Sequence, residues 1–448
     1  MKKLLILAYD FPPYVSVGGL RPYNWYKYLK EYGVEPVVIT RQWQNKHGNH
    51  LDYIEAGYSD EVIVETTEFG TIVRTPYRPN LSNTVLLKYG AHRFRLLRKS
   101  ITAFYEIAQF IFPVGPKAAI YKAAKHYLKS NEVDAIIATG DPFVLFAYAS
   151  KLSSTFNTPW IADYRDPWSQ NFSSKKKSFQ RTFDKWFELY YVKSAQHILT
   201  VDVLFQHKIH TLFPDKMPAL ISNGFDPEGI SEVENIEQSH EILTFSFIGT
   251  IYEWHPLMPL LAVFNKIASE QHFDFRIKFY GTNLNELLGK VVSEKFTALQ
   301  NKMVILPKLP NTELLRELKK DNVLLLFNYY EFTGTKIYDY VALKRKILLC
   351  FDNDVEANRL KDKYYFKHIE IDENPQRTII ERTNSGVIVK DSSHLEELIN
   401  DLWQEFSQTG DIRCDSVGIE NYSRKIQVEK LAEIIQEIDA LKSDEQKG

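Results

Sequence analysis

The chain has few cysteines. Its 448 residues include only Cys350 and Cys414, and neither cysteine lies at a ligand-like spacing from a histidine. A disulfide framework or a structural zinc site is therefore not expected, and we predict neither a metal nor a resident cofactor. Such sparse cysteine usage fits the reducing cytoplasm, where we place the protein.

The sequence also lacks a charge excess and a long apolar run. Lysine plus arginine total 55 and aspartate plus glutamate total 57, so no global field argues for nucleic acid as the main partner. No window approaches the ~18 uninterrupted apolar residues of a membrane span. The basic start of the chain precedes only a short apolar run before Asp10, which predicts a first β-strand and not a signal peptide.

Short continuous apolar runs recur through the chain, separated by helical patterns. Continuous runs are typical of strands buried on both faces of a parallel sheet. In the first half, we expect strands at 4–7, 36–40, 135–139, 160–162, 197–201 and 218–222. In the second half, we expect them at 243–248, 275–280, 303–306, 323–327, 346–351 and 386–389. The fold class predicted is α/β, with two Rossmann-like doubly wound domains facing a central cleft and a C-terminal closing helix.

This pattern sets the expected domain boundaries. Residues 1–223 form the first domain, 224–241 an acid-rich linker, and 242–425 the second domain. An amphipathic pattern predicts a closing helix at 426–441, and the charged tail 442–448 is expected to be disordered. Ligands of doubly wound sheets bind at the carboxyl ends of the strands, so the crevice between the domains is the default site.

The stretch from Glu331 to Asp339 places two carboxylates eight positions apart around a Gly-containing turn. A strand precedes the turn and a helix is predicted from Lys336 to Lys344. The N–H groups that open such a helix suit a diphosphate, with Lys336 as an added charge, and Asp339 suits two ribose hydroxyls. The residues alone leave open an ordinary helix start with an acidic first turn and a solvated lysine.

Polar and glycine residues follow three other predicted strands. Gly18, Gly19 and Arg21 follow the first strand, where a Gly pair lets backbone approach a ligand closely, although a plain loop fits equally. The G-x-G-x-x-G spacing is missing, which disfavours a nicotinamide or flavin enzyme. Strands at 160–162 and 243–248 precede two further clusters: Asp163, Arg165, Asp166 and Trp168; Gly249, Thr250, Glu253, Trp254 and His255.

Each cluster has a plainer interpretation. Charges at a strand end are costly unless they are solvated, paired or used, so an ion pair of Arg165 with Asp163 or Asp166 is an alternative to substrate contact. His255 precedes a proline and is therefore expected in a solvated loop, with a catalytic role the lesser alternative.

Together these features resemble the retaining glycosyltransferases with two Rossmann-like domains called GT-B, and among them the family-4 group that builds bacterial polysaccharides. The resemblance spans nearly the whole chain. The family's Gly-Gly loop matches Gly18–Gly19, its Asn-Gly-x-Asp motif matches 223–226, and its acid-x7-acid motif matches Glu331 and Asp339. Phe279-Tyr280-Gly281 is similar to the family's second C-terminal strand and glycine turn.

The chain departs from the family pattern at two places. Arg165 stands where the family has a histidine that contacts the donor sugar. Thr250 and His255 stand where it has an arginine and a lysine that clamp phosphate, so Lys336 becomes the candidate to neutralise the diphosphate, with help from Arg165.

Site assignments follow from the resemblance. It implies catalytic roles for Arg165, Lys336 and Glu331. It implies donor contacts at Gly18, Gly19, Gly249, Thr250, His255, Gly281, Gly334, Thr335, Lys336 and Asp339. It implies an acceptor side at Arg21, Asp163, Asp166 and Trp168.

The function implied is transfer of a sugar from a nucleotide-diphosphate donor, with a uridine diphosphate sugar expected, to a glycan or lipid-linked saccharide. The family retains anomeric configuration, uses no metal and relies on positioning and charge stabilisation. The departures leave open a binding protein of the same pathway that has lost catalysis. An epimerase or a phosphorylase on the same architecture is a further alternative.

One segment bears on the acceptor. No acidic residue occurs from Phe69 to Tyr105, whereas seven lysines and arginines do. Apolar residues within 88–111 follow helical spacing, which predicts a basic helix either at the inner face of an anionic membrane or packed on the core with a solvated basic face.

Overall fold

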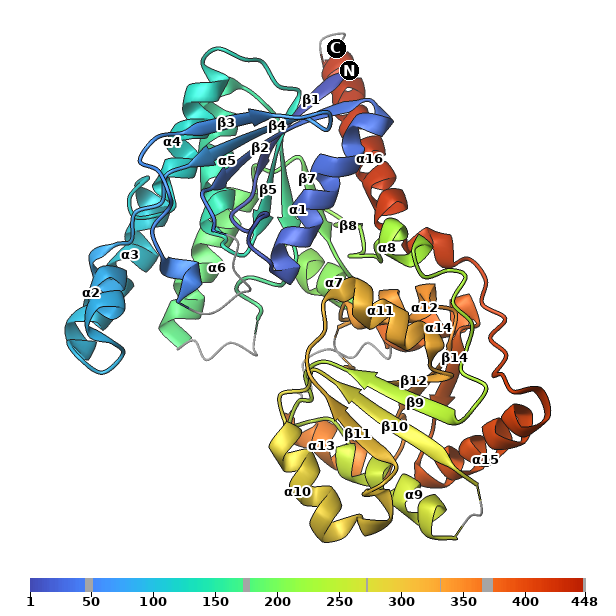
Figure 1. The fold of residues 1–448 in the computed structure, drawn as a ribbon. Helices are drawn as coiled ribbons and strands as arrows, with labels where there is room; N and C mark the ends of the chain where they lie inside the picture. Colours follow the sequence, from blue (N-terminus) through green and yellow to red (C-terminus); the bar gives the residue numbers. More distant parts are fainter. Residues whose placement is uncertain (45–50, 172–177, 271–272, 331, 365–373, 446–448) are drawn as a thin grey trace. The chain divides into compact units, whose positions relative to one another are not determined.

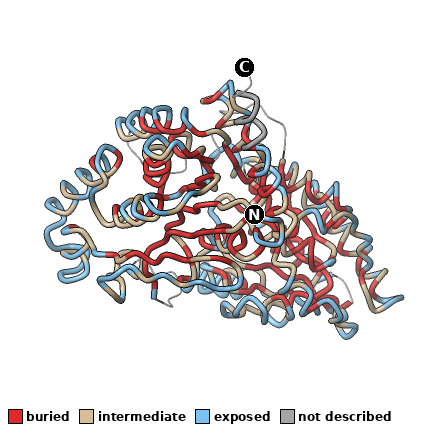
Figure 2. Tube along the Cα trace, turned by 90° about the horizontal axis from the view of Figure 1, so that it is seen from above, coloured by how far each residue is buried: buried red, intermediate tan, exposed pale blue. Residues whose placement is uncertain are grey.

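The computed structural model describes residues 1–44, 51–171, 178–270, 273–330, 332–364 and 374–445 (Figure 1). Glu331 lies outside the described residues. The chain divides into two compact units: Met1–Ser222 with Lys425–Gly448, and Asn223–Arg424. Each unit is built on its own sheet, and Figure 2 shows the buried segments of the chain in red.

Unit 1 contains an eight-stranded sheet in the order β3-β4-β2-β1-β5-β6-β7-β8, in which only β3 runs antiparallel to its neighbour. Its strands are β1 (Lys2–Leu7), β2 (Val34–Arg41), β3 (Ile63–Thr66), β4 (Thr71–Thr75), β5 (Ala135–Gly140), β6 (Trp160–Tyr164), β7 (His197–Thr200) and β8 (Ala219–Leu220). Its helices are α1 (Val17–Tyr28), α2 (Leu81–Tyr89), α3 (Arg95–Ile111), α4 (Ala118–Leu128), α5 (Val144–Phe156), α6 (Ser178–Val192), α7 (Val203–Leu212) and α16 (Arg424–Glu445).

Unit 2 contains a six-stranded sheet in the order β11-β10-β9-β12-β13-β14, parallel throughout. Its strands are β9 (Leu243–Ile248), β10 (Phe275–Tyr280), β11 (Met303–Leu306), β12 (Val323–Phe327), β13 (Lys346–Cys350) and β14 (Gly386–Val389). Its helices are α8 (Pro227–Ser231), α9 (Leu257–Glu270), α10 (Asn285–Lys295), α11 (Asn311–Lys320), α12 (Lys336–Ala342), α13 (Val355–Tyr364), α14 (Pro375–Thr383) and α15 (Ser392–Thr409).

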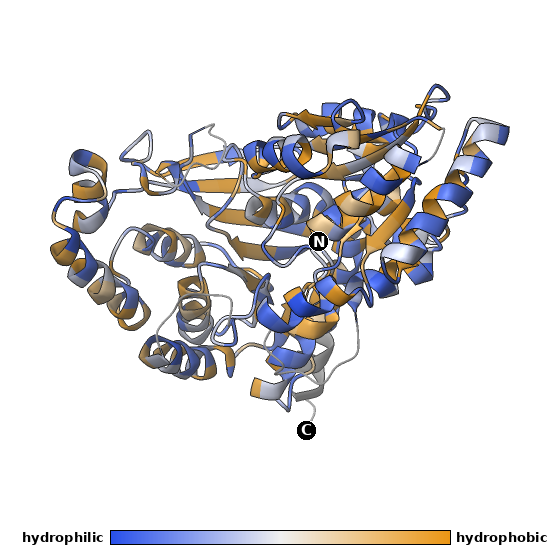
Figure 3. Ribbon diagram, turned by 90° about the horizontal axis from the view of Figure 1, so that it is seen from below, coloured by the Kyte–Doolittle hydropathy of each residue, from blue (hydrophilic) through white to orange (hydrophobic). Residues whose placement is uncertain are grey.

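The predicted fold class is confirmed: both units are α/β layers around parallel strands. The expected strands form because their continuous apolar runs are covered on both faces; β9 and β12 are buried along their whole length. Figure 3 shows the same pattern, with hydrophobic residues concentrated in the strands and both colours along the helices. The edge strand β3 and its neighbour β4 were not predicted, and the pattern of β3 alternates over only four residues.

Three expectations about local structure differ from the structure. The segment predicted as a linker contains α8, and Phe225 and Val233 pack in a core of unit 2. The predicted closing helix is α16, which runs to Glu445, and Val428 and Leu431 pack with the core around β1. The predicted basic helix is two helices, α2 and α3, because the chain breaks at Gly90, whose φ is +78°.

Candidate functional site

Lys336 is a half-buried cation at the carboxyl end of the sheet of unit 2. It is the first residue of α12, and its ammonium nitrogen donates to the carbonyl oxygen of Thr250 at 3.3 Å and lies 4.8 Å from the centre of the Phe247 ring. Burial lowers the pKa of Lys336 to about 8. No carboxylate in the described part of the chain forms an ion pair with it, so its charge is desolvated without a counter-ion.

The turn after β9 is shaped around this lysine. Gly249 has a φ of +72°, and a Cβ at this position would lie 3.0 Å from Cε of Lys336 and 3.2 Å from its Nζ. A glycine at this position therefore allows both the positive φ and the close approach of the Lys336 side chain. The same turn is tied to the turn after β10, where the side chain of Asn283 accepts from the N–H of Ile251 at 2.8 Å. The strand-end loops of β9 and β10 thus form one continuous edge.

Asp339 lies one turn after Lys336 on α12 and is half-buried. Burial raises the pKa of Asp339 to about 6, the nearby Arg424 opposes this shift, and Asp226 adds to it. The carboxylate accepts no hydrogen bond from the residues that the structure describes. It is therefore an acceptor that a ligand hydroxyl can use.

His255 is buried, with 4% of its surface exposed, so the prediction of a solvated histidine is wrong. It does lie on the loop before α9, but aromatic rings surround it, among them Phe327 at 4.8 Å and Tyr329 at 5.2 Å between ring centres. Burial and, to a lesser extent, the Lys336 charge lower its pKa to about 3. The imidazole is consequently neutral at pH 7.

The hydrogen bonds of His255 fix its tautomer. The backbone N–H of Tyr252 donates to Nδ1 at 3.3 Å, so the ring hydrogen resides on Nε2. Nε2 is buried and has no hydrogen-bonding partner among the described residues. A buried donor without an acceptor costs about 1–3 kcal/mol, a cost that a bound oxygen atom would remove.

The predicted donor residues Gly281, Gly334 and Thr335 lie at the strand ends of unit 2 as well. Gly281 follows β10 with a φ of +57°, and a Cβ there would meet Cα of Lys308 at 3.0 Å. Gly334 has a φ of +71° in the turn before α12, and Thr335 caps this helix without a side-chain hydrogen bond. The structure therefore brings the loops carrying Gly249, Gly281 and Lys336 to one edge, where phosphate oxygens can meet backbone N–H groups.

In unit 1, Arg165 lies against the start of α1. A Cβ on Gly18 would fall 1.9 Å from Nη1 of Arg165 and 2.8 Å from a carboxylate oxygen of Asp10. The guanidinium donates to the carbonyl of Gly140 at 2.9 Å and to that of Asp141. Three strand ends, those of β1, β5 and β6, therefore place a cation beside a glycine.

Asp10 belongs to this cluster, although sequence analysis assigned it no role. Its carboxylate accepts from the hydroxyl of Ser16 at 3.0 Å, and that hydroxyl in turn accepts from the N–H of Gly19 at 3.0 Å. Burial raises the pKa of Asp10, and the Arg165 charge opposes the rise. The Gly pair lies in the first turn of α1, not in the loop before it.

Two of the predicted acceptor-side residues form a buried ion pair. Arg21 donates to the carboxylate of Asp163 at 2.7 Å from Nη2 and 3.0 Å from Nε, and also to the carbonyl of Ile221 at 2.7 Å. Asp163 is fully buried and also accepts from the Thr139 hydroxyl at 2.8 Å. This pair joins α1 to β6 and replaces the Arg165–Asp163 pair considered from the sequence. Both side chains of the pair are buried, whereas the sequence analysis placed them on the acceptor side of the site.

Trp168 and Asp166 differ in exposure. Trp168 is buried, with 3% of its surface exposed, and stacks on Phe143 at 5.0 Å and on Phe110 at 5.3 Å. It supports α3 and α5 from within and does not face an acceptor. Asp166 is exposed beside Arg165 and is the one predicted acceptor-side carboxylate that can meet a solute.

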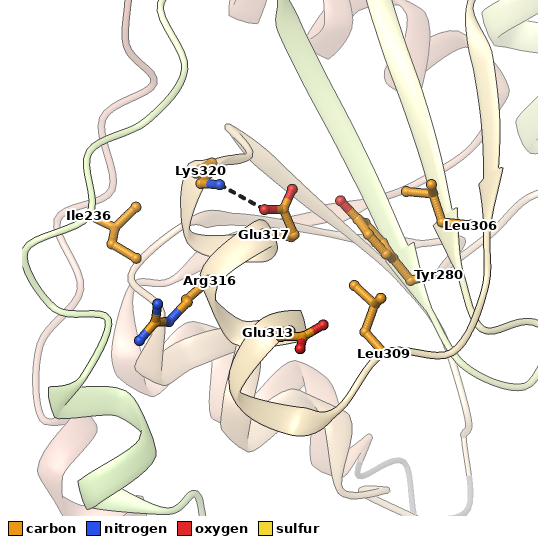
Figure 4. Close-up of a pocket in the computed structure, with 8 residues that line it drawn as sticks. All are labelled: Ile236, Tyr280, Leu306, Leu309, Glu313, Arg316, Glu317 and Lys320. Atoms are coloured by element: carbon orange, nitrogen blue, oxygen red, sulfur yellow. Dashed lines mark hydrogen bonds and ion pairs between the residues drawn. The ribbon is translucent and has the colours of Figure 1, made fainter.

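A pocket of about 480 Å³ lies elsewhere in unit 2, between α11 and the edge of the sheet (Figure 4). Its walls carry both charge signs, and Lys320 pairs with Glu317 at 2.7 Å. None of the predicted donor residues lines it. Residues 1–44, 51–171, 178–270, 273–330, 332–364 and 374–445 contain no cluster of histidine, cysteine and acidic side chains suited to a metal ion.

The sequence matches no protein-family model and no curated protein. Solved structures do match along nearly the whole chain. Sucrose-phosphate synthase from Thermosynechococcus elongatus has a TM-score of 0.59 at 14% identity, covering 98% of this chain and 100% of that one. A glycosyltransferase from Rickettsia africae has a TM-score of 0.53 at 16% identity, covering 98% of each chain.

Anabaena HepE in complex with UDP-glucose has a TM-score of 0.52 at 12% identity, covering 97% of this chain and 100% of that one. At these identities the likeness concerns the fold. The two α/β units thus have the GT-B architecture of these proteins.

Replacing Lys336 by methionine should stabilise the ligand-free protein. The substitution keeps the length of the side chain and removes a desolvated charge, so we expect a gain of about 1–3 kcal/mol in the free energy of unfolding at pH 7. Urea denaturation of the two proteins measures it. The folded pKa of about 8 lies below the unfolded value, so the parent gains stability as pH rises from 8 toward 10 and the difference shrinks.

The exposed Lys308 provides the matched control, since Lys308→Met should change stability by less than about 0.5 kcal/mol. A Lys336→Met variant that is less stable than the parent at pH 7 would show that the charge is compensated within the fold.

The contact between Gly18 and Arg165 predicts coupling between their substitutions. Gly18→Ala should destabilise unit 1 by about 1–3 kcal/mol because the added methyl overlaps the guanidinium. In an Arg165→Ala background the cost should fall by at least about 0.5 kcal/mol. A double-mutant cycle of unfolding free energies measures this coupling, and strict additivity would contradict the described contact.

Proposed function

We propose that this chain is a glycosyltransferase that moves a sugar from a nucleotide-diphosphate donor, a uridine diphosphate sugar in the first instance, to a glycan or lipid-linked saccharide. The observation that carries the proposal is the Lys336 ammonium, desolvated without a counter-ion at the strand ends of unit 2. A diphosphate would supply the missing negative charge. The complex of the similar Anabaena HepE with UDP-glucose supports the choice of donor.

Each group around Lys336 would take a part in donor binding. The diphosphate oxygens would accept from Lys336, from the backbone of the Gly249 turn and from Nε2 of His255, the buried donor that lacks an acceptor. The carboxylate of Asp339 would accept from the ribose hydroxyls. A neutral His255 adds a hydrogen bond without a second charge, so Lys336 would be the main electrostatic contact.

The chemistry proposed is retaining transfer without a protein nucleophile. As the bond between the anomeric carbon and the diphosphate breaks, negative charge grows on the departing phosphate, and Lys336 would stabilise it. The acceptor hydroxyl would attack from the face that the diphosphate leaves and would pass its proton to a phosphate oxygen. Arg165 and the exposed Asp166 are the candidates in unit 1 to orient substrate. We place this transfer in surface polysaccharide synthesis.

A binding protein without turnover is the second candidate function. It is favoured by one observation: the two residues after β9 at the family's clamp positions, Thr250 and His255, carry no charge at pH 7. Such a protein would bind the nucleotide sugar and leave it intact.

The proposal is tested by titrating the purified full-length chain with UDP-, ADP- and GDP-sugars and following both binding and nucleotide release. We expect one base to bind, with thermal stability rising by about 2.7 kcal/mol at a hundred times the dissociation constant. Lys336→Met should weaken binding by roughly 1.5–3 kcal/mol, as expected for a charged hydrogen bond. Lys308→Met should bind as the parent does.

Release of nucleotide when candidate acceptors are added distinguishes the two functions. Binding with no release by any acceptor, or hydrolysis, would favour the binding protein. Absence of binding to every nucleotide sugar, or full affinity in Lys336→Met, would refute the donor site.

Donor affinity should depend on pH through Asp339. Its pKa of about 6 in the free protein means that the carboxylate is mostly protonated at pH 5 and ionised at pH 7. If the ionised form accepts from the ribose, affinity should rise by about tenfold between pH 5 and pH 7, as measured by calorimetry. A nucleotide sugar is the correct ligand, because its diphosphate has no terminal phosphate that titrates near pH 6.

Asp339→Asn should remove this dependence, since an amide does not titrate. A flat profile for the parent, or an equal slope in the variant, would exclude Asp339 from the ribose contact.

A further inference from the structure

Helix α6 carries an aromatic stripe on its outer face. Phe179, Phe183, Trp186 and Tyr190 are spaced by four, three and four residues, which places them on one side of a helix. They are 56%, 47%, 58% and 64% exposed. Trp186 and Tyr190 stack on each other at 5.6 Å. Four exposed aromatic side chains in a row are unusual for a solvated helix and mark an interaction surface.

Helix α3 carries a second apolar stripe. Leu97, Phe104 and Ile111 follow helical spacing and are 53%, 65% and 50% exposed. Other residues of this helix make its contacts within unit 1: Ala108 and Phe110 are buried, and the hydroxyl of Ser82 on α2 bonds to the Thr102 hydroxyl at 2.8 Å. Together α2 and α3 stand away from the sheet of unit 1, and most of their residues are exposed (Figures 1 and 2).

The two stripes belong to one surface because their helices are joined at their inner sides. Phe110 of α3 stacks on Phe187 of α6 at 4.7 Å, and the Tyr191 hydroxyl donates to the Phe110 carbonyl. Phe187 and Tyr191 face inward, which leaves the aromatic stripe on the opposite side of α6. We call the exposed residues of α3 and α6 with those joining α2 to α3 the α3–α6 surface.

Positive charge borders this surface. Two of the seven basic residues between Phe69 and Tyr105 are paired, Arg74 with Glu65 and Arg78 with Asp60. Arg98 donates to the carbonyl of Ala91 and holds the turn between α2 and α3. The others, Lys88, Arg93, Arg95 and Lys99, are exposed and form no ion pair within the described part of the chain. A surface that combines free cations with aromatic side chains is complementary to anionic lipid.

We propose that the α3–α6 surface binds the face of an anionic membrane. Tryptophan and tyrosine favour the boundary between lipid headgroups and acyl chains, where an apolar ring and a polar edge are both satisfied. The aromatic stripe would enter this layer, and the four free cations would meet lipid phosphates. The binding is peripheral: none of the helices described is both long and apolar enough to cross a bilayer.

The experiment uses the full chain and no nucleotide, so its outcome is independent of the proposed donor site. Sedimentation with vesicles of phosphatidylcholine and phosphatidylglycerol in equal parts, and of phosphatidylcholine alone, measures the partition coefficient. We expect binding to the anionic vesicles only, weakening as salt rises. Replacing Arg93, Arg95 and Lys99 with glutamine should lower the partition coefficient at least about tenfold.

The aromatic contribution is tested with Phe183→Ser and Trp186→Ser together, which should also lower partitioning at least about tenfold. Tyr58→Ser, an exposed aromatic of unit 1 outside the surface, is the matched control and should partition as the parent does. Substituting exposed residues leaves the fold intact, which thermal unfolding of each variant checks.

Equal binding to neutral vesicles, no binding to either, or parent-like partitioning of both variants would overturn the proposal. So would a self-associating parent that becomes monomeric in the aromatic variant while never binding vesicles, since the surface would then pair two copies of the chain.

Discussion

The structure of the candidate site depends on one unbalanced charge, the Lys336 ammonium. It is held at the strand ends of unit 2 by the Thr250 carbonyl and the Phe247 ring, with Gly249 leaving room for its methylene groups. Two groups of the same site have shifted pKa values: burial and the Lys336 charge keep His255 neutral, and burial raises the pKa of Asp339. A fold that desolvates a cation without a counter-ion loses stability, and an anionic ligand would restore it.

Unit 1 contrasts with this arrangement. Its buried pair, Arg21 with Asp163, is fully satisfied by hydrogen bonds and holds α1 against β6. A second arginine of unit 1, Arg165, is held in place by two backbone carbonyls and lies beside Gly18, with no bidentate carboxylate partner among the described residues. Both arginines occur near strand ends, yet only the second leaves hydrogen-bonding capacity for a ligand. Burial and partner geometry therefore distinguish an arginine that is fully satisfied within the fold from one that can still contact a ligand.

The sequence predicted the two sheets well, because continuous apolar runs such as 243–248 and 323–327 leave few alternatives. It also brought Lys336 and Gly249 into one proposed site through strand-end reasoning. The sequence did not predict ion pairs whose two members lie far apart in the chain. Arg21 and Asp163, for example, are 142 positions apart. His255 was expected in water by a local rule, but Phe327 and Tyr329, from a different strand end, enclose it. The helical spacing of the aromatic residues on α6 can be recognised in the sequence, but their exposure to solvent can be seen only in the structure.

The measurement that tests the central claim most directly is proton uptake on donor binding. Calorimetric titration of the parent with its nucleotide sugar at pH 8.5, in buffers of different ionisation enthalpy, counts the protons bound. Lys336 is then largely neutral, and an adjacent diphosphate would raise its pKa, so the account predicts uptake of up to about one proton in the parent and none in Lys336→Met. Binding with no uptake by the parent, or with equal uptake by both proteins, would contradict it.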